Sequence, residues 1–252
     1  MKNPPIYTPI QPIEISDRWF PARAKFGLYE SSGIVAPNVT SILGWKFPFD
    51  KSKWIKSEPH IDHDLVARES AERGTAVHLA MECWLRGERH TPDPEFLPWI
   101  RPLQLLVAKA DATLGVEVPI HHHVEAIGAY AGSCDGLMQV GDEVVICDYK
   151  TKRAGKRVYA KYCDQQKLQL AAYSLAINAI YEDQLPAKVS RVSLLFAHPE
   201  TNKAVSVISV EGADLLHYQG KWLSILGEWY SEFGDSVVAE QKRFDDSVRK
   251  PF

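Results

Sequence analysis

Two aspartates lie on neighbouring segments that have the pattern of a tight β-hairpin. An apolar run follows Asp135, another precedes Asp148, and only Gly141 and Asp142 separate the two runs. A two-residue loop that begins with Gly is typical of a hairpin, because its backbone twist matches that of the flanking strands. Counting outward from this loop places Asp135 directly opposite Asp148, so we expect the two carboxylates to share one face of the sheet.

Lys150 is expected on that same face, because side chains alternate along a strand and Lys150 follows Asp148 by two residues. Both faces of strand 143–150 are otherwise largely apolar, which predicts a central, buried strand. Two carboxylates there are unfavourable unless a cation compensates them, and Mg²⁺ prefers carboxylate oxygens. The alternative is a surface hairpin end at which Lys150 simply neutralises both aspartates. A bulge near Gly136 would alter this register.

The elements around the hairpin predict an α/β fold, a mixed central β-sheet flanked by helices. We expect helices over residues 64–87, 94–114, 163–181 and 212–232, with Gly115 ending the second. Strands are expected over 116–124, 130–140, 143–150, 188–197 and 203–210. Residues 1–62 are interpreted as an extension packed on a core of residues 63–233, and 234–252 as a polar C-terminal tail.

The bulk composition excludes several classes of protein. With 45% hydrophobic and 24% charged residues, the chain has the balance of a globular protein. A net charge of -3 and a pI near 6.3 argue against a tight, passive, sequence-independent DNA binder. No stretch could span a bilayer and no signal core opens the chain, so we expect a cytoplasmic protein without membrane contact. Cys134 and Cys147 lie in apolar strand patterns and are expected to be buried thiols.

Four ordered motifs resemble the PD-(D/E)XK nuclease superfamily, and most closely its RecB-like exonucleases. They are Gly74-x-x-x-His78-x-x-x-Glu82, Asp135, Asp148-Tyr149-Lys150 and Gln169-x-x-x-Tyr173. Residues 39–43 also resemble a segment near the start of such enzymes, among them the mitochondrial genome maintenance exonuclease, and the resemblance extends to phage-type exonucleases. It implies a restriction-endonuclease-like core with an N-terminal helical elaboration, in which residues 1–62 could form a DNA-contacting arch.

The resemblance implies a site for Mg²⁺ or Mn²⁺. Its ligands would be Asp135, Asp148, the backbone carbonyl of Tyr149, and His78. Lys150 would position or help to deprotonate the attacking water and stabilise the developing phosphorane charge. No iron–sulfur cluster is expected, because no cysteine follows Cys163.

Three further positions are expected near this site. Glu82 lies one helical turn beyond His78, so it would either orient the imidazole or lie on a solvated face. Gln169 and Tyr173 share a helix face that, by resemblance, borders the site and positions the lysine or the substrate. The alternative for this pair is a packed core Tyr beside an exposed Gln.

A run of cations directly follows the proposed catalytic lysine. It either contacts the DNA backbone or forms a solvated loop, and it consists of Lys152, Arg153, Lys156, Arg157 and Lys161. Segment 50–57 is basic around Trp54, which suits base stacking and phosphate contact or, alternatively, a solvated helix end. Glu117 could supply an additional acidic ligand. His121 and His123 share one strand face while His122 points away, so these histidines are interpreted as structural.

The motifs together predict a metal-dependent DNA exonuclease in recombination, repair or replication processing. By resemblance, its substrate would be single-stranded DNA or duplex ends, with single-stranded DNA as substrate or intermediate. A recombination or replication protein partner is compatible with this function, but no motif identifies one. The alternatives are a structure-specific or nicking endonuclease, a nucleic-acid-binding module with degenerate catalysis, and a protein that retains the fold alone.

Overall fold

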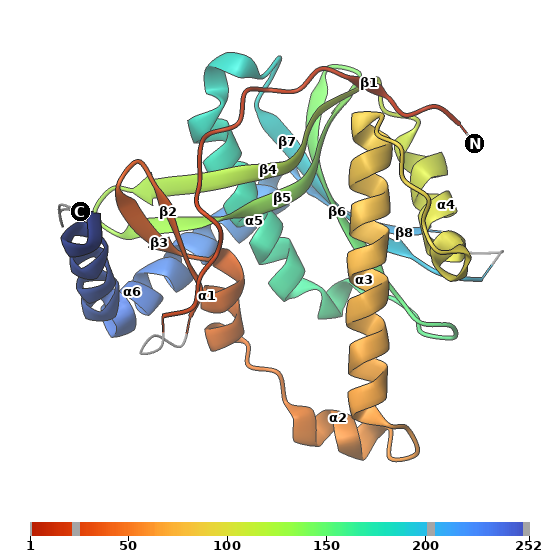
Figure 1. Cartoon of the computed structure of the whole chain (residues 1–252), viewed down its shortest axis with the longest axis horizontal. Helices are drawn as coiled ribbons and strands as arrows, with labels where there is room; N and C mark the ends of the chain where they lie inside the picture. Colours follow the sequence, from red (N-terminus) through yellow and green to blue (C-terminus); the bar gives the residue numbers. More distant parts are fainter. Residues whose placement is uncertain (1, 22–25, 201–204, 249–252) are drawn as a thin grey trace.

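The fold is built on a six-stranded mixed sheet, and the computed structural model describes residues 2–21, 26–200 and 205–248. The strands are β1 (Ile6–Tyr7), β4 (Ala112–Val124), β5 (Gly128–Val140), β6 (Glu143–Thr151), β7 (Val189–Ala197) and β8 (Val205–Glu211). They lie side by side in this order (Figure 1). β1 pairs with β4 and β6 pairs with β7 in parallel, and the other neighbours are antiparallel. The predicted mixed sheet is confirmed.

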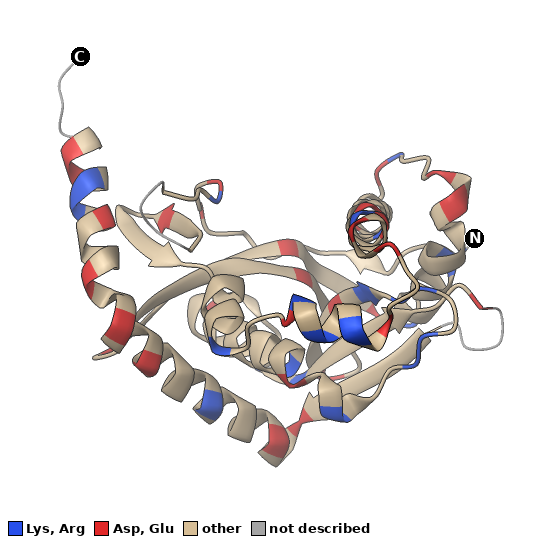
Figure 2. Ribbon diagram, turned by 90° about the horizontal axis from the view of Figure 1, so that it is seen from below, with Lys and Arg blue, Asp and Glu red and all other residues tan. Residues whose placement is uncertain are grey.

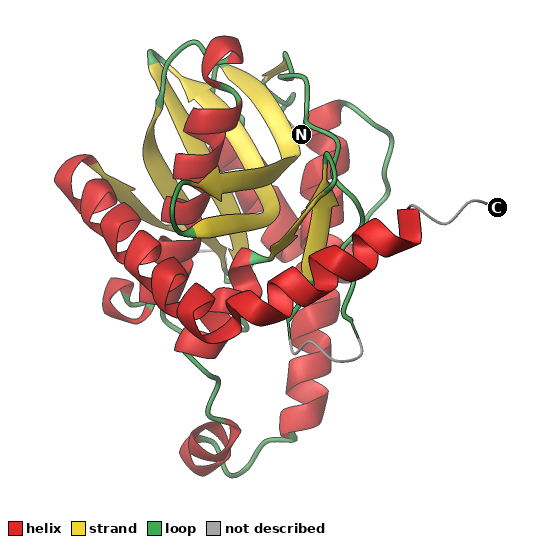
Figure 3. Ribbon diagram, turned by 90° about the vertical axis from the view of Figure 1, so that its left-hand side faces the viewer, coloured by secondary structure: helices red, strands yellow, loops and turns green. Residues whose placement is uncertain are grey.

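Helices cover both faces of the sheet, as expected. On one face lie α5 (Asp164–Ile180) and the long α6 (Gly212–Val248), and on the other lie α3 (His63–Arg86) and α4 (Leu97–Val107). Figure 3 shows how strongly the sheet curves and how α6 runs across the molecule beneath it. Among the described residues, no helix combines the length and apolar character needed to cross a membrane.

Strand β6 lies between these two layers and is buried on both of its faces. Val144 and Ile146 belong to the core beneath α5 and α6, whereas Val145, Cys147 and Tyr149 belong to the core beneath α3 and α4. The prediction of a central, doubly covered strand is therefore confirmed. Any polar side chain of this strand must find its partners inside the protein.

The β5–β6 hairpin has the predicted register. Val140 pairs with Glu143 across the turn, and the pairing continues without a shift to Gly136 and Cys147. Gly141 has a φ of 61°, the left-handed value that the first position of such a turn requires. Away from the turn, the backbone ladder ends with the pair of Gly136 and Cys147, so Asp135 lies one residue beyond its end.

The second predicted helix is too long. A short 3-10 helix, η1 (Pro94–Phe96), precedes α4, and β4 already begins at Ala112. Gly115 does not end a helix. It lies in β4, where the register of the β4–β5 ladder shifts between Thr113 and Gly115. A Cβ at Gly115 would lie 2.3 Å from Cγ2 of Val118. The short apolar run there fits a helix end or a buried strand equally well, so its periodicity could not distinguish the two structures.

Helix α6 extends beyond the predicted boundary at residue 234. It continues to Val248, because Val237 and Phe244 pack against the main core and prolong its apolar face. Gln241 then reaches the N-terminal part of the chain. Its Oε1 accepts a hydrogen bond from the Val35 N–H at 2.7 Å, and its Nε2 donates one to the Gly33 carbonyl at 2.8 Å. Residues 249–252 of the predicted tail lie outside the described residues.

The N-terminal segment both completes the body and projects from it. A hairpin of β2 (Leu28–Ser31) and β3 (Ile34–Pro37) leads into α1 (Val39–Lys46), which packs against α5 and α6. Helix α2 (Lys51–Ser57), residues 58–62 and the first half of α3 then project away from the body (Figure 1). We call this projecting part the arm.

Trp222 anchors α6 to the sheet, which generates a stability prediction. It is fully buried, and its ring meets that of Tyr130 edge to face at 5.1 Å. Trp222→Ala should lower the free energy of unfolding by about 3–5 kcal/mol, since it leaves a large cavity. Urea unfolding measures this loss. Leu216→Ala, at an exposed position of the same helix, is the control and should change the value by no more than about 0.5 kcal/mol. Similar losses in both variants would contradict this packing.

Candidate active site

Asp148 and Lys150 meet at the end of β6, as their spacing predicted. Lys150 Nζ donates a hydrogen bond to Asp148 Oδ1 at 2.8 Å and lies 2.6 Å from Oδ2. The Asp148 side chain is only 3% exposed. Its Oδ2 is buried, and although it lies close to the ammonium, it receives no well-oriented hydrogen bond within the described part of the chain. One carboxylate oxygen therefore keeps lone pairs available for a further cation.

Asp135 lies beside this pair, where the β5–β6 ladder stops. Its Oδ2 accepts a hydrogen bond from the Tyr149 N–H at 2.8 Å. This bond takes the place of the next ladder bond, because Gly136 and Cys147 form the last backbone pair. The carboxylate is thereby fixed to the backbone between Asp148 and Lys150.

His78 reaches the same place from α3. Its Nε2 lies 2.7 Å from the Tyr149 carbonyl, and its Nδ1 lies 3.5 Å from Asp135 Oδ2. A carbonyl only accepts hydrogen bonds, so Nε2 carries a proton and donates it to the Tyr149 carbonyl. Tyr149 was expected to offer its carbonyl to a metal. In the structure that carbonyl orients His78.

Glu117 completes a cluster of possible ligands. Ligand atoms of His78, Glu117 and Asp135 all lie within 4.8 Å of one another. Glu117 has a φ of 50°, an unfavourable backbone conformation for a residue with a Cβ. Ser133 donates a hydrogen bond from its hydroxyl to Glu117 Oε2 at 2.8 Å. The strained backbone and this hydrogen bond both hold the carboxylate toward the other ligands.

The electrostatics of the site favour binding of a cation. Burial and the neighbouring Asp148 raise the pKa of Asp135 from 3.8 to about 7, although His78 and Lys150 oppose this shift. Burial alone would lower the pKa of Lys150, but Asp148 and Asp135 outweigh it and leave that pKa raised. The single ammonium therefore does not compensate both carboxylates.

These donors suit a small divalent cation with oxygen and imidazole ligands. Ligand atoms of Asp135, Glu117 and His78 lie together. The nearby Asp148 Oδ2 is buried and, within the described part of the chain, has no well-oriented hydrogen bond, although the Lys150 ammonium lies close to it. Mg²⁺ and Mn²⁺ accept such ligands.

Gln169 and Tyr173 form one unit behind the acidic cluster. Gln169 Nε2 donates a hydrogen bond to the Tyr173 hydroxyl at 3.1 Å. The Tyr173 ring packs on Gly132 so closely that a Cβ there would lie 3.0 Å from it. Burial raises the pKa of Tyr173, the hydrogen bond from Gln169 opposes this shift, and Asp148 and Asp135 add to it. Tyr173 is buried in the main core, as the alternative for this pair expected, and a role of the two residues at the site stays a prediction.

Glu82 was expected either to orient His78 or to lie on a solvated helix face, and in the structure it pairs with an arginine. Its Oε1 pairs with Arg86 Nη1 at 2.8 Å, one turn further along α3. His78 is instead oriented by the Tyr149 carbonyl and Asp135. The spacing rule for helices allows Glu82 to meet either neighbour, and the cation on its other side is the stronger partner.

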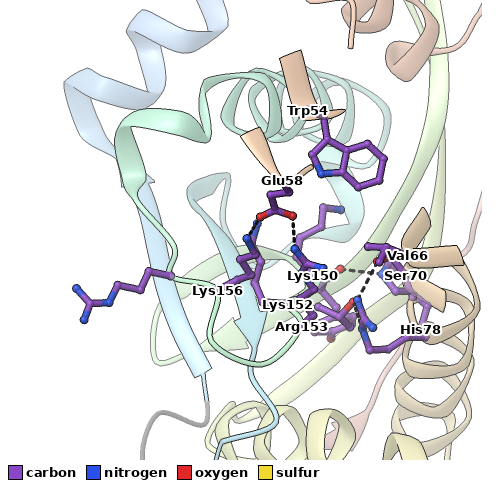
Figure 4. Close-up of a pocket in the computed structure, with 14 residues that line it drawn as sticks. Trp54, Glu58, Val66, Ser70, His78, Lys150, Lys152, Arg153 and Lys156 are labelled. Carbon is purple, nitrogen blue, oxygen red and sulfur yellow. Dashed lines mark hydrogen bonds and ion pairs between the residues drawn. The ribbon is translucent and has the colours of Figure 1, made fainter. Parts of the chain in front are cut away.

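A pocket of about 460 Å³ opens in front of His78 and Lys150. The arm forms one wall through Trp54, Glu58 and Ser70, and the loop after β6 forms the other (Figure 4). Four of the five cations predicted to contact DNA line this pocket, and they are Lys152, Arg153, Lys156 and Arg157. Lys161 does not line it; it belongs to the 3-10 helix η2 (Ala160–Tyr162), where its ammonium lies 4.9 Å from the centre of the Tyr162 ring.

Arg73 is a site residue that the sequence did not single out. It is buried, its Nε donates a hydrogen bond to Thr151 Oγ1 at 3.2 Å, and its guanidinium lies 5.2 Å from the centre of the Trp99 ring. It lines the pocket together with Gly74. An Arg within a polar stretch of helix usually lies in solvent, so only its position next to the Gly74 motif could have indicated a role.

The histidines at 121–123 lie elsewhere, as the strand periodicity suggested. His121 Nε2 contacts the Ile34 carbonyl at 3.0 Å, and His122 packs edge to face on Tyr130 at 5.5 Å. Both contacts support the packing of β4 rather than chemistry. Cys134 and Cys147 are buried free thiols, as predicted.

Comparisons with known proteins assign the chain to a family. A family model of the PD-(D/E)XK nuclease superfamily matches residues 105–247. Among solved structures, the chain is similar to SSO0001 (TM-score 0.36, 13% identity, 74% of this chain and 83% of that one). It is also similar to a protein from Eubacterium rectale named as an exonuclease candidate (TM-score 0.41, 10% identity, 71% of this chain and 70% of that one). A further similar structure is an alkaline exonuclease from Laribacter hongkongensis (TM-score 0.34, 16% identity, 71% of this chain and 91% of that one). The search of curated proteins found no match.

The raised pKa of Asp135 predicts how stability depends on pH without metal. Between about pH 4 and pH 7 the folded protein keeps a proton on Asp135 that the unfolded chain has released, because the folded-state pKa is about 7. The free energy of unfolding should therefore fall as the pH rises through this window. Asp135→Asn should be more stable than the wild type at pH 8 by roughly 1–4 kcal/mol, since one pKa unit corresponds to about 1.4 kcal/mol.

Urea unfolding in EDTA at several pH values measures this difference. It should shrink as the pH falls and vanish below about pH 4, where the aspartate is protonated in both states. Asp183→Asn, at an exposed position, is the control. A constant difference across the pH range would show that the gain does not come from the charge of Asp135.

Proposed function

We propose that this chain, which belongs to the PD-(D/E)XK nuclease superfamily, is a divalent-metal-dependent exonuclease that acts on DNA. One observation carries the proposal. Asp135, Asp148 and Lys150 converge at the end of a buried strand, and His78 approaches them from α3. This is a complete set of groups for hydrolysing a phosphodiester, and each has its expected residue type.

His78, Asp135, Asp148 and Glu117 would hold Mg²⁺ or Mn²⁺. When bound, such a metal lowers the pKa of water and neutralises charge on phosphate oxygens. The Tyr149 peptide prepares this ligand set from both sides, because its N–H fixes Asp135 and its carbonyl fixes His78. Ligands oriented in this way need little rearrangement to bind.

Lys150 is the group proposed to act on the attacking water. Its ammonium is held by Asp148, so it faces the acidic cluster rather than bulk solvent. From there it can donate to a water or to a phosphate oxygen and stabilise the negative charge that develops on the pentavalent phosphorus. Gln169 and Tyr173, joined by a hydrogen bond, are proposed to border the carboxylates and to keep this face of the site rigid.

The pocket supports nucleic acid as the substrate. Its walls carry four cations from the loop after β6, buried Arg73 and the indole of Trp54. Cations that follow a backbone and an aromatic face that accepts a base are the usual features of a single-strand binding path. We propose that a DNA end enters between the arm and this loop, with processing of ends in recombination, repair or replication as its purpose.

End-labelled single-stranded and blunt duplex DNA test the proposal, each with Mg²⁺, Mn²⁺ or EDTA. The wild type should degrade DNA only with metal, and Lys150→Ala should reduce the rate roughly 10²–10⁴-fold, the usual loss on removal of a group that handles protons. Lys188→Ala, which removes a lysine whose side chain is 72% exposed, is the matched control and should retain full activity.

Circular single-stranded and duplex substrates distinguish the types of nuclease. An exonuclease leaves them intact, whereas cleavage of circles would show an endonuclease. If the wild type and Lys150→Ala are equally inert with both metals, the chain does not hydrolyse DNA. DNA binding that survives in that case would indicate a binding module with degenerate catalysis.

A further inference from the structure

Glu58 connects the arm to the two central cations of the pocket. One of its carboxylate oxygens pairs with Lys156 Nζ and the other with Arg153 Nη2 (Figure 4). The Glu58 side chain is 20% exposed, and those of Arg153 and Lys156 are 31% and 44% exposed. Both pairs span more than ninety residues of sequence, from the end of α2 to the loop after β6.

The chemistry of this contact is that of a phosphate site. An Arg and a Lys that converge on two oxygens of one anion are the side chains that proteins use to bind a phosphodiester. Arg153 follows the proposed catalytic Lys150 by three residues, and both line the same pocket. A strand whose scissile phosphate lies at Lys150 would bring a neighbouring phosphate to these cations. The carboxylate of Glu58 occupies that position.

The helix that ends at Glu58 is exposed along its length. Glu58 is the C-terminal cap residue of α2, a helix with no buried residue, and Lys51 of this helix pairs with Asp64 within the arm itself. Figure 2 shows several basic residues of α2 at the outer end of the arm. A short exposed helix held to the loop by ion pairs can separate from it at small cost, because partly exposed pairs are weak.

We propose that Glu58 is an internal substitute for a nucleic-acid phosphate, which an incoming strand displaces from Arg153 and Lys156. The proposal rests on the nuclease function argued above and names a phosphate subsite for it. Without DNA, Glu58 neutralises the two cations and lowers the affinity for polyanions in general. When a strand enters, its phosphate takes both cations, and the arm with Trp54 is released to close on the bases.

Equilibrium binding tests this without cleavage. The parent is Lys150→Ala in EDTA, and fluorescence anisotropy measures its affinity for a short fluorescein-labelled single strand at low salt. Adding Glu58→Gln should tighten binding roughly three- to tenfold, the scale of two partly exposed ion pairs. Glu72→Gln, which removes the same charge from an exposed position of the arm, should change the affinity less than twofold. Thermal unfolding checks that each variant is folded.

A second parent variant distinguishes competition for Arg153 and Lys156 from a general effect of removing a negative charge. With Arg153→Ala and Lys156→Ala present, Glu58→Gln should no longer tighten binding, because the cations for which Glu58 competes are gone. Equal or weaker binding by Glu58→Gln in the parent would overturn the inference and show that Glu58 is a strut that holds both cations in place. If the parent binds no DNA at all, the proposed function fails, and this inference fails with it.

Discussion

The structure depends on how it keeps two carboxylates close together in a buried strand. Asp148 has almost no contact with solvent, and burial together with the neighbouring Asp148 raises the pKa of Asp135 to about 7. A buried pair of like charges is strongly unfavourable unless cations and donors surround it. Lys150, His78 and the Tyr149 N–H are these partners, and each comes from an element whose place is fixed by packing. The two apolar cores on either side of β6 hold this arrangement together.

The peptide of Tyr149 has a central part in this arrangement. In a sheet, the N–H and carbonyl of a strand residue normally bond to the backbone of neighbouring strands. Here the Tyr149 carbonyl accepts a hydrogen bond from His78, and the Tyr149 N–H donates one to Asp135. The end of the β5–β6 ladder is what frees the N–H. An interruption of regular structure is therefore the feature that positions the polar groups, as is common where a sheet supports chemistry.

Local rules predicted the part of the site that lies on the hairpin. A two-residue turn set the register, and period two placed Lys150 beside Asp148, so the contact at 2.8 Å followed from counting. Glu117 could only be suggested, because its orientation depends on a positive φ and an irregular ladder that residue types do not reveal. Glu58 and Arg73 were missed for another reason. Their partners lie far away in the sequence, and an isolated Glu or Arg in a polar stretch has no distinguishing pattern. The same limit applies to Glu82, for which helical spacing allowed two partners, and to the length of α6, which depends on what its last turns pack against.

The bonds from Gln241 to the β2–β3 hairpin impose an order on how the chain can mature. Residues 33 and 35 are bound by a side chain that the ribosome adds about two hundred residues later, so the hairpin cannot have its final partners during most of translation. The sheet strands and α5 can pair as they emerge, since their contacts are mostly between successive elements. The β2–β3 hairpin therefore gains these two hydrogen bonds only after the last turns of α6 have been synthesised. Proteolysis within the last turns of α6 should accordingly loosen the N-terminal hairpin first, leaving the strands that carry the carboxylates paired.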